Sequence, residues 1–409
     1  MGLFIREKYL KKIRGFYHDT EVIKVITGVR RSGKSCLMEM VKEELVGGGV
    51  RLENIIFLDL DSRAYRKIKT ADQLDALIEY VAKTEGVKYL FIDEIQNVKN
   101  FEEVVNAYRA DGNFSIFITG SNSYLLSGEL VTKLTGRYVE FELFPLSFDE
   151  YLDMKNFYGK KIEANLQIEL NHYLNEGGFP KTIQYDDFAD KRTYVKSVID
   201  EIFEKDIKKR VKVRNVESFN NVKNFIINNF GATISVKGLQ EALAKNGIEI
   251  KRATLARYID ALTQSKILYQ CDRFDMKSKR VLSGEKKYYL ADISFYFATN
   301  TDNRINYGPA LENMVYIYAR SLDYAVSVGR IGKLECDFIL RDSNLNYSYV
   351  QVAYTISENK TTEDREYAPL ESIPDNYPKY VLTTDYLLQN RNGIKHVNLL
   401  EFMRKHLNF

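Results

Sequence analysis

Cysteine, proline and long apolar runs are all scarce in this 409-residue chain. The three cysteines, Cys36, Cys271 and Cys336, lie far apart and form no CxxC pair, so the sequence offers neither a disulfide framework nor a zinc motif. With 6 prolines and 23 glycines, the composition is not that of a disordered or a fibrous chain. No segment approaches the roughly 18 apolar residues of a membrane span. Residues 1–15 are charged throughout and lack the apolar core of a signal peptide. We therefore expect a globular cytoplasmic protein that does not enter a membrane.

Positive charge is unevenly distributed along the chain, although the net charge is only +3. Lys and Arg exceed Asp and Glu by about 11 over residues 191–290, which leaves about −8 for the rest of the chain. A basic segment of this kind indicates an anionic partner, and an ordinary solvated surface is the alternative.

The first third of the chain alternates between short apolar runs and stretches of helical period. Short apolar runs bounded by polar residues are typical of buried parallel strands. Their alternation with helices predicts a three-layer α/β domain with a parallel sheet. The expected strands are residues 22–27, 55–60, 89–92, 115–119 and 138–143, and the clearest helices are 34–46 and 71–83.

The remainder of the chain changes character twice. It is helical and increasingly basic from about 160 to 230, with a break at Gly177-Gly178-Phe179-Pro180, because glycine pairs and proline are poor helix interiors. Residues 232–290 read as two helices followed by a β-hairpin whose expected tip is 283–286 (SGEK), the order of a winged helix-turn-helix. The last 110 residues alternate between helix and strand again and suggest a small α/β domain.

A phosphate-binding loop is predicted directly after the first strand. The sequence GVRRSGKS fits GxxxxGK[ST] and opens a helix, as the mechanism requires. Lys34 would neutralise the β- and γ-phosphates of ATP, and the Ser35 hydroxyl would bind Mg²⁺. A glycine-rich loop without a ligand is the alternative. The predicted nucleotide-binding residues are Gly28, Val29, Arg30, Arg31, Ser32, Gly33, Lys34, Ser35 and Cys36.

A second signal lies at the end of the third expected strand, where four apolar residues precede Asp93 and Glu94. Asp93 would hold Mg²⁺ through its water shell, because Mg²⁺ dehydrates reluctantly. Glu94 would orient and deprotonate the attacking water. An ordinary strand terminus is the alternative.

A catalytic glutamate in this place indicates the division of P-loop proteins in which another strand separates the P-loop strand from the acidic strand. Residues 115–119 are the candidate for that strand. Ser121 or Asn122, which follow it, would then face the γ-phosphate as a sensor, although small polar residues are also common in loops.

Three arginines complete the predicted site. Arg137 would act as an arginine finger, in a neighbouring subunit or across the same site, unless it is a surface arginine paired with Glu140 or Glu142. Of Arg30 and Arg31, one is expected to bind nucleotide and the other to brace the lid.

The segments 24–35, 91–98 and 117–151, followed by Gly177-Gly178-Phe179-Pro180, resemble a widespread bacterial and archaeal family of AAA+ ATP-binding proteins with a C-terminal domain of unknown function. The resemblance covers essentially the whole chain. It implies ATP binding and hydrolysis, a winged-helix middle and a C-terminal domain like the restriction-endonuclease fold. The expected division is an ATPase core at 1–155, a helical lid at 156–230, a winged helix at 231–298 and the C-terminal domain at 299–409.

Nuclease folds of that type hold Mg²⁺ with an acidic residue on one strand and Glu/Gln-x-Lys on the next. Glu312, Asp337 and Gln351 can fill acidic or amide positions, but Ala353 stands where the lysine belongs. Alanine cannot stabilise charge on an attacked phosphate, so the fold is retained as an expectation and nuclease activity is disfavoured.

The basic segment allows two functions. A winged helix places one helix in the major groove of DNA, and a protein-contact module is the alternative. We expect an ATPase that works on double-stranded DNA or on an unidentified protein, with a slowly hydrolysing switch as the alternative and further copies of the chain as candidate partners. The candidate phosphate contacts are Arg252, Arg257, Lys277, Lys279, Arg280, Lys286 and Lys287.

Overall fold

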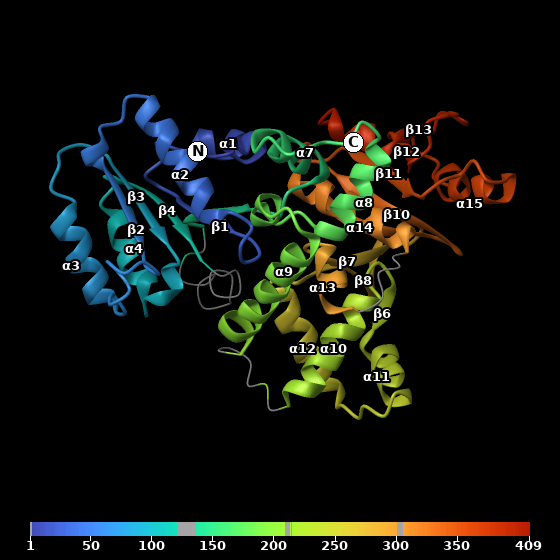
Figure 1. The fold of residues 1–409 in the computed structure, drawn as a ribbon, viewed down its shortest axis with the longest axis horizontal. Helices are drawn as coiled ribbons and strands as arrows, with labels where there is room; N and C mark the ends of the chain where they lie inside the picture. Colours follow the sequence, from blue (N-terminus) through green and yellow to red (C-terminus); the bar gives the residue numbers. More distant parts are fainter. Residues whose placement is uncertain (1, 121–133, 135, 209–212, 214, 301–305) are drawn as a thin grey trace. The chain divides into compact units, whose positions relative to one another are not determined.

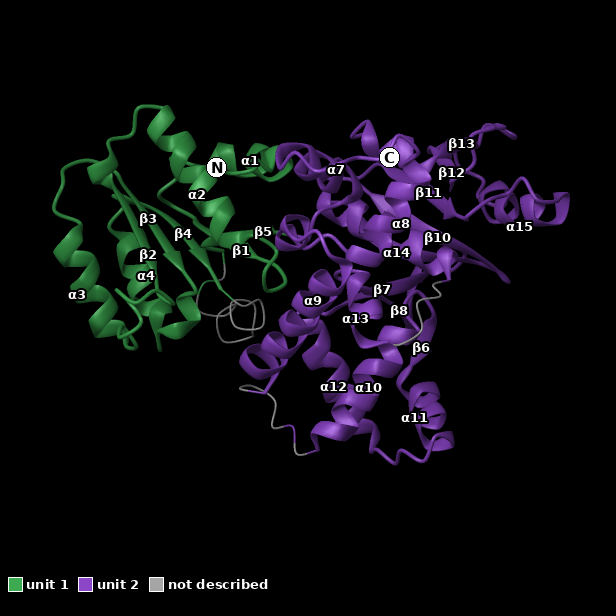
Figure 2. Cartoon of the chain, in the orientation of Figure 1, with its two compact units in different colours: residues 1–143 green, residues 144–409 purple. Residues whose placement is uncertain are grey.

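The computed structural model describes residues 2–120, 134, 136–208, 213, 215–300 and 306–409. The chain divides into two compact units, residues 1–143 and 144–409 (Figure 2). The first unit ends shortly before the boundary at residue 155 that the sequence suggested.

The first unit is built on a parallel sheet with the strand order β2-β3-β4-β1-β5 (Figure 1). β4 therefore lies between the P-loop strand β1 and the acidic strand β3, which confirms the predicted order. The strands are β1 (Ile23–Thr27), β2 (Ile55–Asp59), β3 (Lys88–Asp93), β4 (Phe114–Thr119) and β5 (Tyr138–Glu142).

Helices cover both faces of this sheet, because successive strand residues point to opposite sides. Val25 packs in a core with residues of two helices, whereas its neighbour Ile26 packs in a second core with residues of the other two. The first core includes α3 (Ala71–Val81) and α4 (Phe101–Ala110), and the second includes α1 (Glu7–Ile13) and α2 (Lys34–Gly47). The predicted three-layer α/β fold is confirmed.

The second unit contains a mixed sheet with the order β13-β12-β11-β10-β9-β7-β8-β6 in the described part of the chain. The predicted C-terminal α/β part is present, and its strands continue the sheet that the hairpin begins, because β7 pairs in parallel with β9. The strands are β6 (Thr233–Ser235), β7 (Leu268–Asp275), β8 (Arg280–Leu290), β9 (Ala325–Ile331), β10 (Leu334–Arg341), β11 (Tyr347–Val352), β12 (Lys379–Thr383) and β13 (Lys395–Asn398).

The helices of this unit precede, interrupt and follow the strands. They are α7 (Phe148–Phe157), α8 (Leu166–Glu176), α9 (Phe188–Ile202), α10 (Val216–Asn228), α11 (Val236–Lys245), α12 (Arg252–Gln264), α13 (Ser294–Thr299), α14 (Tyr307–Ser321), α15 (Lys360–Glu371) and α16 (Leu399–Arg404). The order α10-β6-α11-α12-β7-β8 contains the two helices and the hairpin that the sequence predicted. The predicted domain boundaries after residues 230 and 298 stay predictions.

The predicted hairpin tip at residues 283–286 is wrong. These residues lie inside β8, and the turn between β7 and β8 is formed by residues 276–279. Gly284 has a positive φ of 100°, and the pairing register shifts between Asp272 and Phe274 on the partner strand. A glycine within a strand commonly marks a bulge, and here the bulge produced a sequence signal that resembles a turn.

A second glycine turn, residues 177–180, ends α8 as predicted and packs into the interior of the second unit. The Gly178 N–H donates to the Asp292 carboxylate at 2.6 Å, and the Gly178 carbonyl accepts from the Leu146 N–H at 2.7 Å. A Cβ on Gly178 would lie only 2.2 Å from the Leu146 carbonyl oxygen, so this close approach requires glycine.

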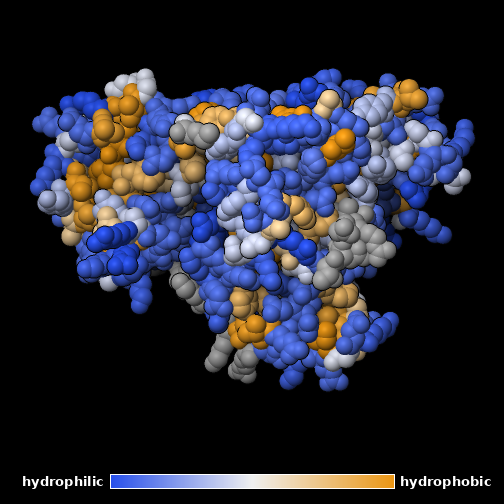
Figure 3. All heavy atoms as spheres, viewed as in Figure 1, coloured by the Kyte–Doolittle hydropathy of each residue, from blue (hydrophilic) through white to orange (hydrophobic). Residues whose placement is uncertain are grey.

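Hydrophilic side chains predominate on the face drawn in Figure 3, with hydrophobic side chains in smaller groups between them. None of the described helices is both long enough and apolar enough to cross a membrane.

Candidate nucleotide site

The predicted phosphate loop joins β1 to α2 and depends on two glycines. Gly28 has a φ of 139°, and a Cβ there would lie 2.1 Å from the Leu143 carbonyl oxygen. Gly33 has a φ of 102° and directly precedes Lys34, the first residue of α2. Both conformations are accessible to glycine and costly for other residues. The loop therefore follows a path that brings its backbone to the positive end of the α2 dipole.

The lysine of the loop is buried, and its ammonium group lies over the loop itself. The Lys34 side chain is 7% exposed, and its Nζ donates to the carbonyl oxygens of Gly28 at 3.1 Å and Val29 at 3.2 Å. Ser35 follows in the first turn of α2 and is exposed, as is Cys36. Arg30 is half-buried, and Arg31 is exposed with a positive φ of 69°.

Ser32 provides a test of whether the loop suits a phosphate. Its side chain is fully buried, and its hydroxyl has no hydrogen-bond partner among the residues that the structure describes. A buried polar group without a partner is costly, so such a group indicates a ligand or a water in this place. The glycine conformations and the buried Lys34 ammonium point the same way, and together these features fit an anionic group.

Arg6, which was not among the predicted site residues, also contacts the loop. This residue directly precedes α1, is 3% exposed, and donates from Nη1 to the Ser32 carbonyl oxygen at 3.2 Å. No motif marks it, because the contact joins positions 26 residues apart that only the packing of α1 against α2 brings together.

The acidic pair lies at the carboxyl end of β3, beside the end of β4. Asp93 is 4% exposed and accepts a hydrogen bond from the Thr119 hydroxyl. The Glu94 N–H donates to that same hydroxyl at 3.2 Å. Thr119 thus ties the two acids to the neighbouring strand. The signal that could have found it was a polar last residue on the predicted sensor strand.

Glu94 leaves the strand in a left-handed conformation, with a φ of 56°, and its carboxylate accepts a hydrogen bond from the Gln96 side-chain amide. Gln96 was also not among the predicted site residues, although it lies only two residues from Glu94. This bond holds the carboxylate in one orientation and uses part of its capacity to accept hydrogen bonds.

Asp93 and Ser35 are the residues suited to hold Mg²⁺. Because β1, β4 and β3 run parallel, Asp93 at the end of β3 and the loop that leads from β1 to Ser35 lie at the same carboxyl edge of the sheet. A buried carboxylate and a serine hydroxyl are oxygen donors of the kind that Mg²⁺ prefers. In the described part of the chain, no three His, Cys, Asp or Glu residues are grouped as an all-protein metal site.

The predicted sensor and finger residues are the remaining members of the site. Ser121 and Asn122 lie outside the described residues. Arg137 is exposed and precedes β5, and its carbonyl oxygen accepts from the Ile23 N–H at 2.9 Å. Because β5 runs parallel to β1, Arg137 lies at the amino edge of the sheet, about 15 Å from the carboxyl edge where the P-loop begins. Arg137 therefore lies at the opposite edge of the sheet from the P-loop of its own chain, and its role as an arginine finger stays a prediction.

In the second unit, the residues compared with a nuclease site form an internal network. The Lys287 ammonium pairs with Glu312 at 3.1 Å and Glu335 at 3.0 Å. The Asp337 carboxylate accepts from the Val352 N–H at 2.8 Å, and the Asp337 N–H donates to Gln351 at 3.3 Å. Burial first, and then the nearby Glu312, raise the pKa of Asp337.

The same network changes the set of candidate DNA contacts. Lys287 is 5% exposed, and although burial lowers its pKa, the carboxylates of Glu312, Asp337 and Glu335 raise it on balance. The prediction that Lys287 contacts phosphates is therefore wrong, because the side chain is occupied inside the protein. Lys286 pairs with Asp272 at 3.1 Å. The exposed candidates are Arg252 and Arg257 on α12 and Lys277, Lys279 and Arg280 at the β7–β8 turn.

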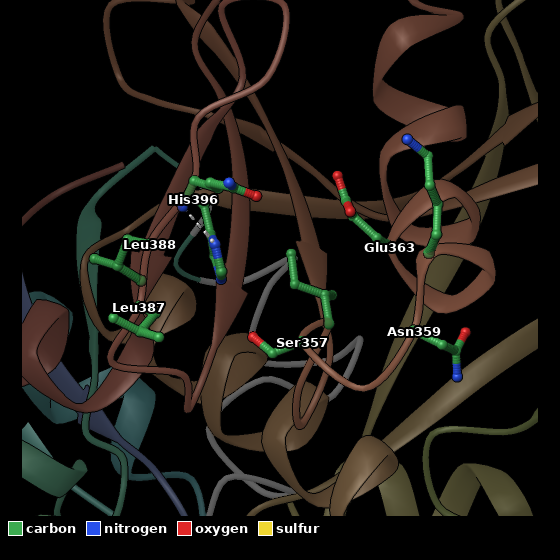
Figure 4. Close-up of a pocket in the computed structure, with 9 residues that line it drawn as sticks. Ser357, Asn359, Glu363, Leu387, Leu388 and His396 are labelled. Atoms are coloured by element: carbon green, nitrogen blue, oxygen red, sulfur yellow. Dashed lines mark hydrogen bonds between the residues drawn. The ribbon is translucent and has the colours of Figure 1, made fainter.

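A cavity of about 520 Å³ opens in the second unit near α15, and its lining residues are not among those that the sequence singled out (Figure 4). Ser357, Asn359 and Leu387 line it, together with His396. Both ring nitrogens of His396 are engaged, one by the Gln389 N–H at 3.1 Å and the other by the Thr383 hydroxyl at 2.8 Å. Burial lowers the pKa of His396, and these two hydrogen bonds hold its imidazole in place.

Comparison with known proteins agrees with the fold of the first unit. Residues 20–152 match the family model of an AAA domain, and residues 167–304 match a domain of unknown function. An uncharacterized protein of Haemophilus influenzae is 35% identical over 98% of this chain and 99% of its own length. An uncharacterized protein of Methanocaldococcus jannaschii is 31% identical over 87% of this chain and 81% of its own length. The chain belongs to this family of AAA+ ATP-binding proteins, in which a domain of unknown function follows the ATPase domain.

A solved structure shares the fold at low sequence identity. The Walker-type ATPase of Pyrococcus abyssi matches with a TM-score of 0.50 and 16% identity, over 72% of this chain and 95% of that chain.

Proposed function

We propose that this protein is a magnesium-dependent ATPase that couples ATP binding and hydrolysis to conformational change. The observation that carries the proposal is the bridge made by Thr119. Its hydroxyl contacts both Asp93 and Glu94 at the carboxyl edge of the sheet, where the P-loop also begins. Strands in this order bring a phosphate loop, an acid for the metal and an acid for the water to one edge.

Each predicted site residue has a task in the proposed reaction. The loop N–H groups and Lys34 hold the phosphates, and Ser35 with Asp93 would hold Mg²⁺, which neutralises charge on the β- and γ-phosphates when bound. Glu94 orients the attacking water and accepts its proton. Ser121 or Asn122 reports on the γ-phosphate, and Arg137 serves the site of a neighbouring copy.

Substitution of Glu94 by Gln tests the hydrolytic step. The amide keeps the shape but loses the proton acceptor, so ATP affinity should persist while kcat falls about 100-fold. Glu79→Gln, an exposed glutamate on α3, is the matched control and should hydrolyse ATP like the wild type. Turnover in Glu94→Gln equal to that of the wild type would show that Glu94 is only a strand terminus.

A slowly hydrolysing switch that acts through protein contacts is the second candidate, and the bond from Gln96 to Glu94 favours it. The Gln96 amide occupies a lone pair of the Glu94 carboxylate, so it competes with the attacking water for that oxygen. If this bond restrains turnover, Gln96→Ala should raise kcat by about two- to tenfold without changing ATP affinity. An unchanged or lower kcat would remove this support for the switch.

For the second unit, we propose contact with double-stranded DNA through the basic side chains of α12 and the β7–β8 turn. Support comes from the order α10-β6-α11-α12-β7-β8, which suits a winged helix, and from the exposure of the basic side chains. Arg252 also donates to Gln240 at 2.8 Å, which fixes the start of α12 against α11.

Neutralising Lys277, Lys279 and Arg280 together tests this contact. DNA affinity should fall alike for every sequence, and the slope of log affinity against log salt should shrink by about 0.9 for each lost phosphate contact. A triple change of the exposed Lys360, Lys395 and Lys405 removes the same charge elsewhere and should leave the slope unchanged. Wild-type protein that binds no duplex at low salt would favour a protein partner instead.

A further inference from the structure

The buried Arg6 contacts both the phosphate loop and α1, the helix that it directly precedes. Its Nη1 donates to the Ser32 carbonyl oxygen at 3.2 Å, and its guanidinium carbon lies 4.5 Å from the centre of the Tyr9 ring. With 3% exposure, the charged group is almost entirely removed from water. A buried guanidinium is costly unless its hydrogen bonds are made. The contacts with the Ser32 carbonyl oxygen and the Tyr9 ring therefore hold the Arg6 side chain in place.

The helix that carries Arg6 is anchored to α2 at its other end as well. Arg14 pairs with Glu44 of α2 at 2.7 Å, and the Tyr17 hydroxyl donates to the same carboxylate at 2.6 Å. The segment between these contacts packs in one apolar core with α2. Arg6 is therefore presented to the loop from a fixed support.

The geometry of the peptide bond gives this contact a consequence for phosphate binding. A trans peptide is planar, so its C=O and the N–H of the next residue point in opposite directions. By holding the Ser32 carbonyl, Arg6 fixes the direction of the Gly33 N–H on the other side of the same peptide plane. Gly33, with a φ of 102°, has no side chain to restrict that peptide otherwise.

We propose that Arg6 is a positioning residue for nucleotide binding, which presets the Ser32–Gly33 peptide so that its N–H faces the α- and β-phosphates. The proposal rests on the proposed function, since it assumes that the loop binds a nucleotide. Arg6 itself touches no phosphate in this account. Its effect is the pre-organisation of a donor that would otherwise be ordered at the expense of binding free energy.

Arg6→Gln tests the proposal, with Lys12→Gln as the matched control. Lys12 also lies over the Tyr9 ring, 5.5 Å from its centre, and carries the same charge on the same helix. Arg6→Gln should weaken ATP and ADP binding by the same factor, about tenfold, because both nucleotides carry the α- and β-phosphates. The KM for ATP should rise by that factor while kcat stays within twofold, and Lys12→Gln should change neither value.

The outcomes separate this proposal from the one on which it rests. Wild-type protein that binds neither ATP nor ADP overturns both. Wild-type binding together with unchanged affinity in Arg6→Gln, or with an equal loss in Lys12→Gln, overturns only the role of Arg6. If Arg6→Gln does not fold, Arg6→Lys decides, because it keeps the charge but not the planar fork. A loss of threefold or more in Arg6→Lys supports the proposal, and wild-type affinity overturns it.

Discussion

Two glycine turns, one in each unit, differ in the charge of the side chains that bind their backbone. In the phosphate loop, two cationic side chains donate to backbone carbonyls: Lys34 to Gly28 and Val29, and Arg6 to Ser32. In the turn at residues 177–180, the partner is an acid instead, because the Asp292 carboxylate accepts the Gly178 N–H at 2.6 Å.

This difference shows what distinguishes a binding loop from a structural turn. Glycine permits a close approach of the backbone in both places. In the second turn the protein supplies the anion itself, since Asp292 also accepts from the N–H and the hydroxyl of Ser294. In the phosphate loop the protein supplies cations, and an external anion completes the arrangement in the proposed function.

The largest effects on stability are expected at the two glycines that lie closest to a backbone oxygen. Gly178→Ala and Gly28→Ala each place a Cβ about 2 Å from a backbone oxygen, that of Leu146 or Leu143. Each change should lower the free energy of unfolding by roughly 3–5 kcal/mol, because a backbone atom cannot move aside cheaply. Gly308→Ala, with 3.6 Å of space and no positive φ, is the control. Denaturant titration measures all three, and equal stability of Gly178→Ala and Gly308→Ala would contradict the argument.

The internal anion of the second turn predicts a pH dependence. Burial raises the pKa of Asp292 from 3.8 to about 6, although hydrogen bonds from Ser294 and Gly178 act in the opposite direction. The folded state then binds the proton more tightly than the unfolded state, so stability is highest below about pH 4 and falls as the pH rises to about 6. The loss should amount to about 3 kcal/mol in the unfolding of the second unit. In Asp292→Asn this part of the profile should be flat, and an unchanged pH profile would show that Asp292 does not titrate there.

Removal of the Lys34 ammonium from the phosphate loop should weaken ATP binding and leave the fold intact. Lys34→Ala should cost about 2–3 kcal/mol of ATP binding, roughly a hundredfold in Kd, because the loop N–H groups cannot replace a charge at the β/γ position. Lys42→Ala removes a lysine from the same helix that pairs with Glu39, and it serves as the control. Undiminished ATP affinity in folded Lys34→Ala would overturn the assignment of the loop.

Two of the buried serines, Ser32 in the phosphate loop and Ser294 beside Asp292, predict the smallest effects. The Ser294 hydroxyl donates to Asp292, whereas the Ser32 hydroxyl has no partner among the described residues. Ser294→Ala should therefore cost about 1 kcal/mol of unfolding free energy, whereas Ser32→Ala removes an unpaired buried hydroxyl and should leave this free energy unchanged or raise it by up to about 1 kcal/mol. Thermal denaturation without nucleotide compares the two variants. A larger cost for Ser32→Ala than for Ser294→Ala would mean that the loop hydroxyl has an internal partner.

The amino-acid sequence by itself determined the three-layer fold of the first unit and the position of the loop between β1 and α2. Both depend on local signals: apolar runs, helical period and glycines at fixed spacing around Lys34. It also determined that β4 lies between β1 and β3, because an acidic pair at the end of a strand is typical of that order.

Only the tertiary structure decided which side chains meet at the site and which do not. Arg6 and Thr119 contact the loop and the acids through packing between distant elements, which no local spacing encodes. Lys287 resembles an exposed wing residue in the sequence, yet β8 buries it against Glu312. Arg137 is a further example, because the direction of β5 places it at the amino edge of the sheet, opposite the P-loop. A local pattern fixes an element and its faces, whereas the partner of each face depends on the order and direction in which the elements pack.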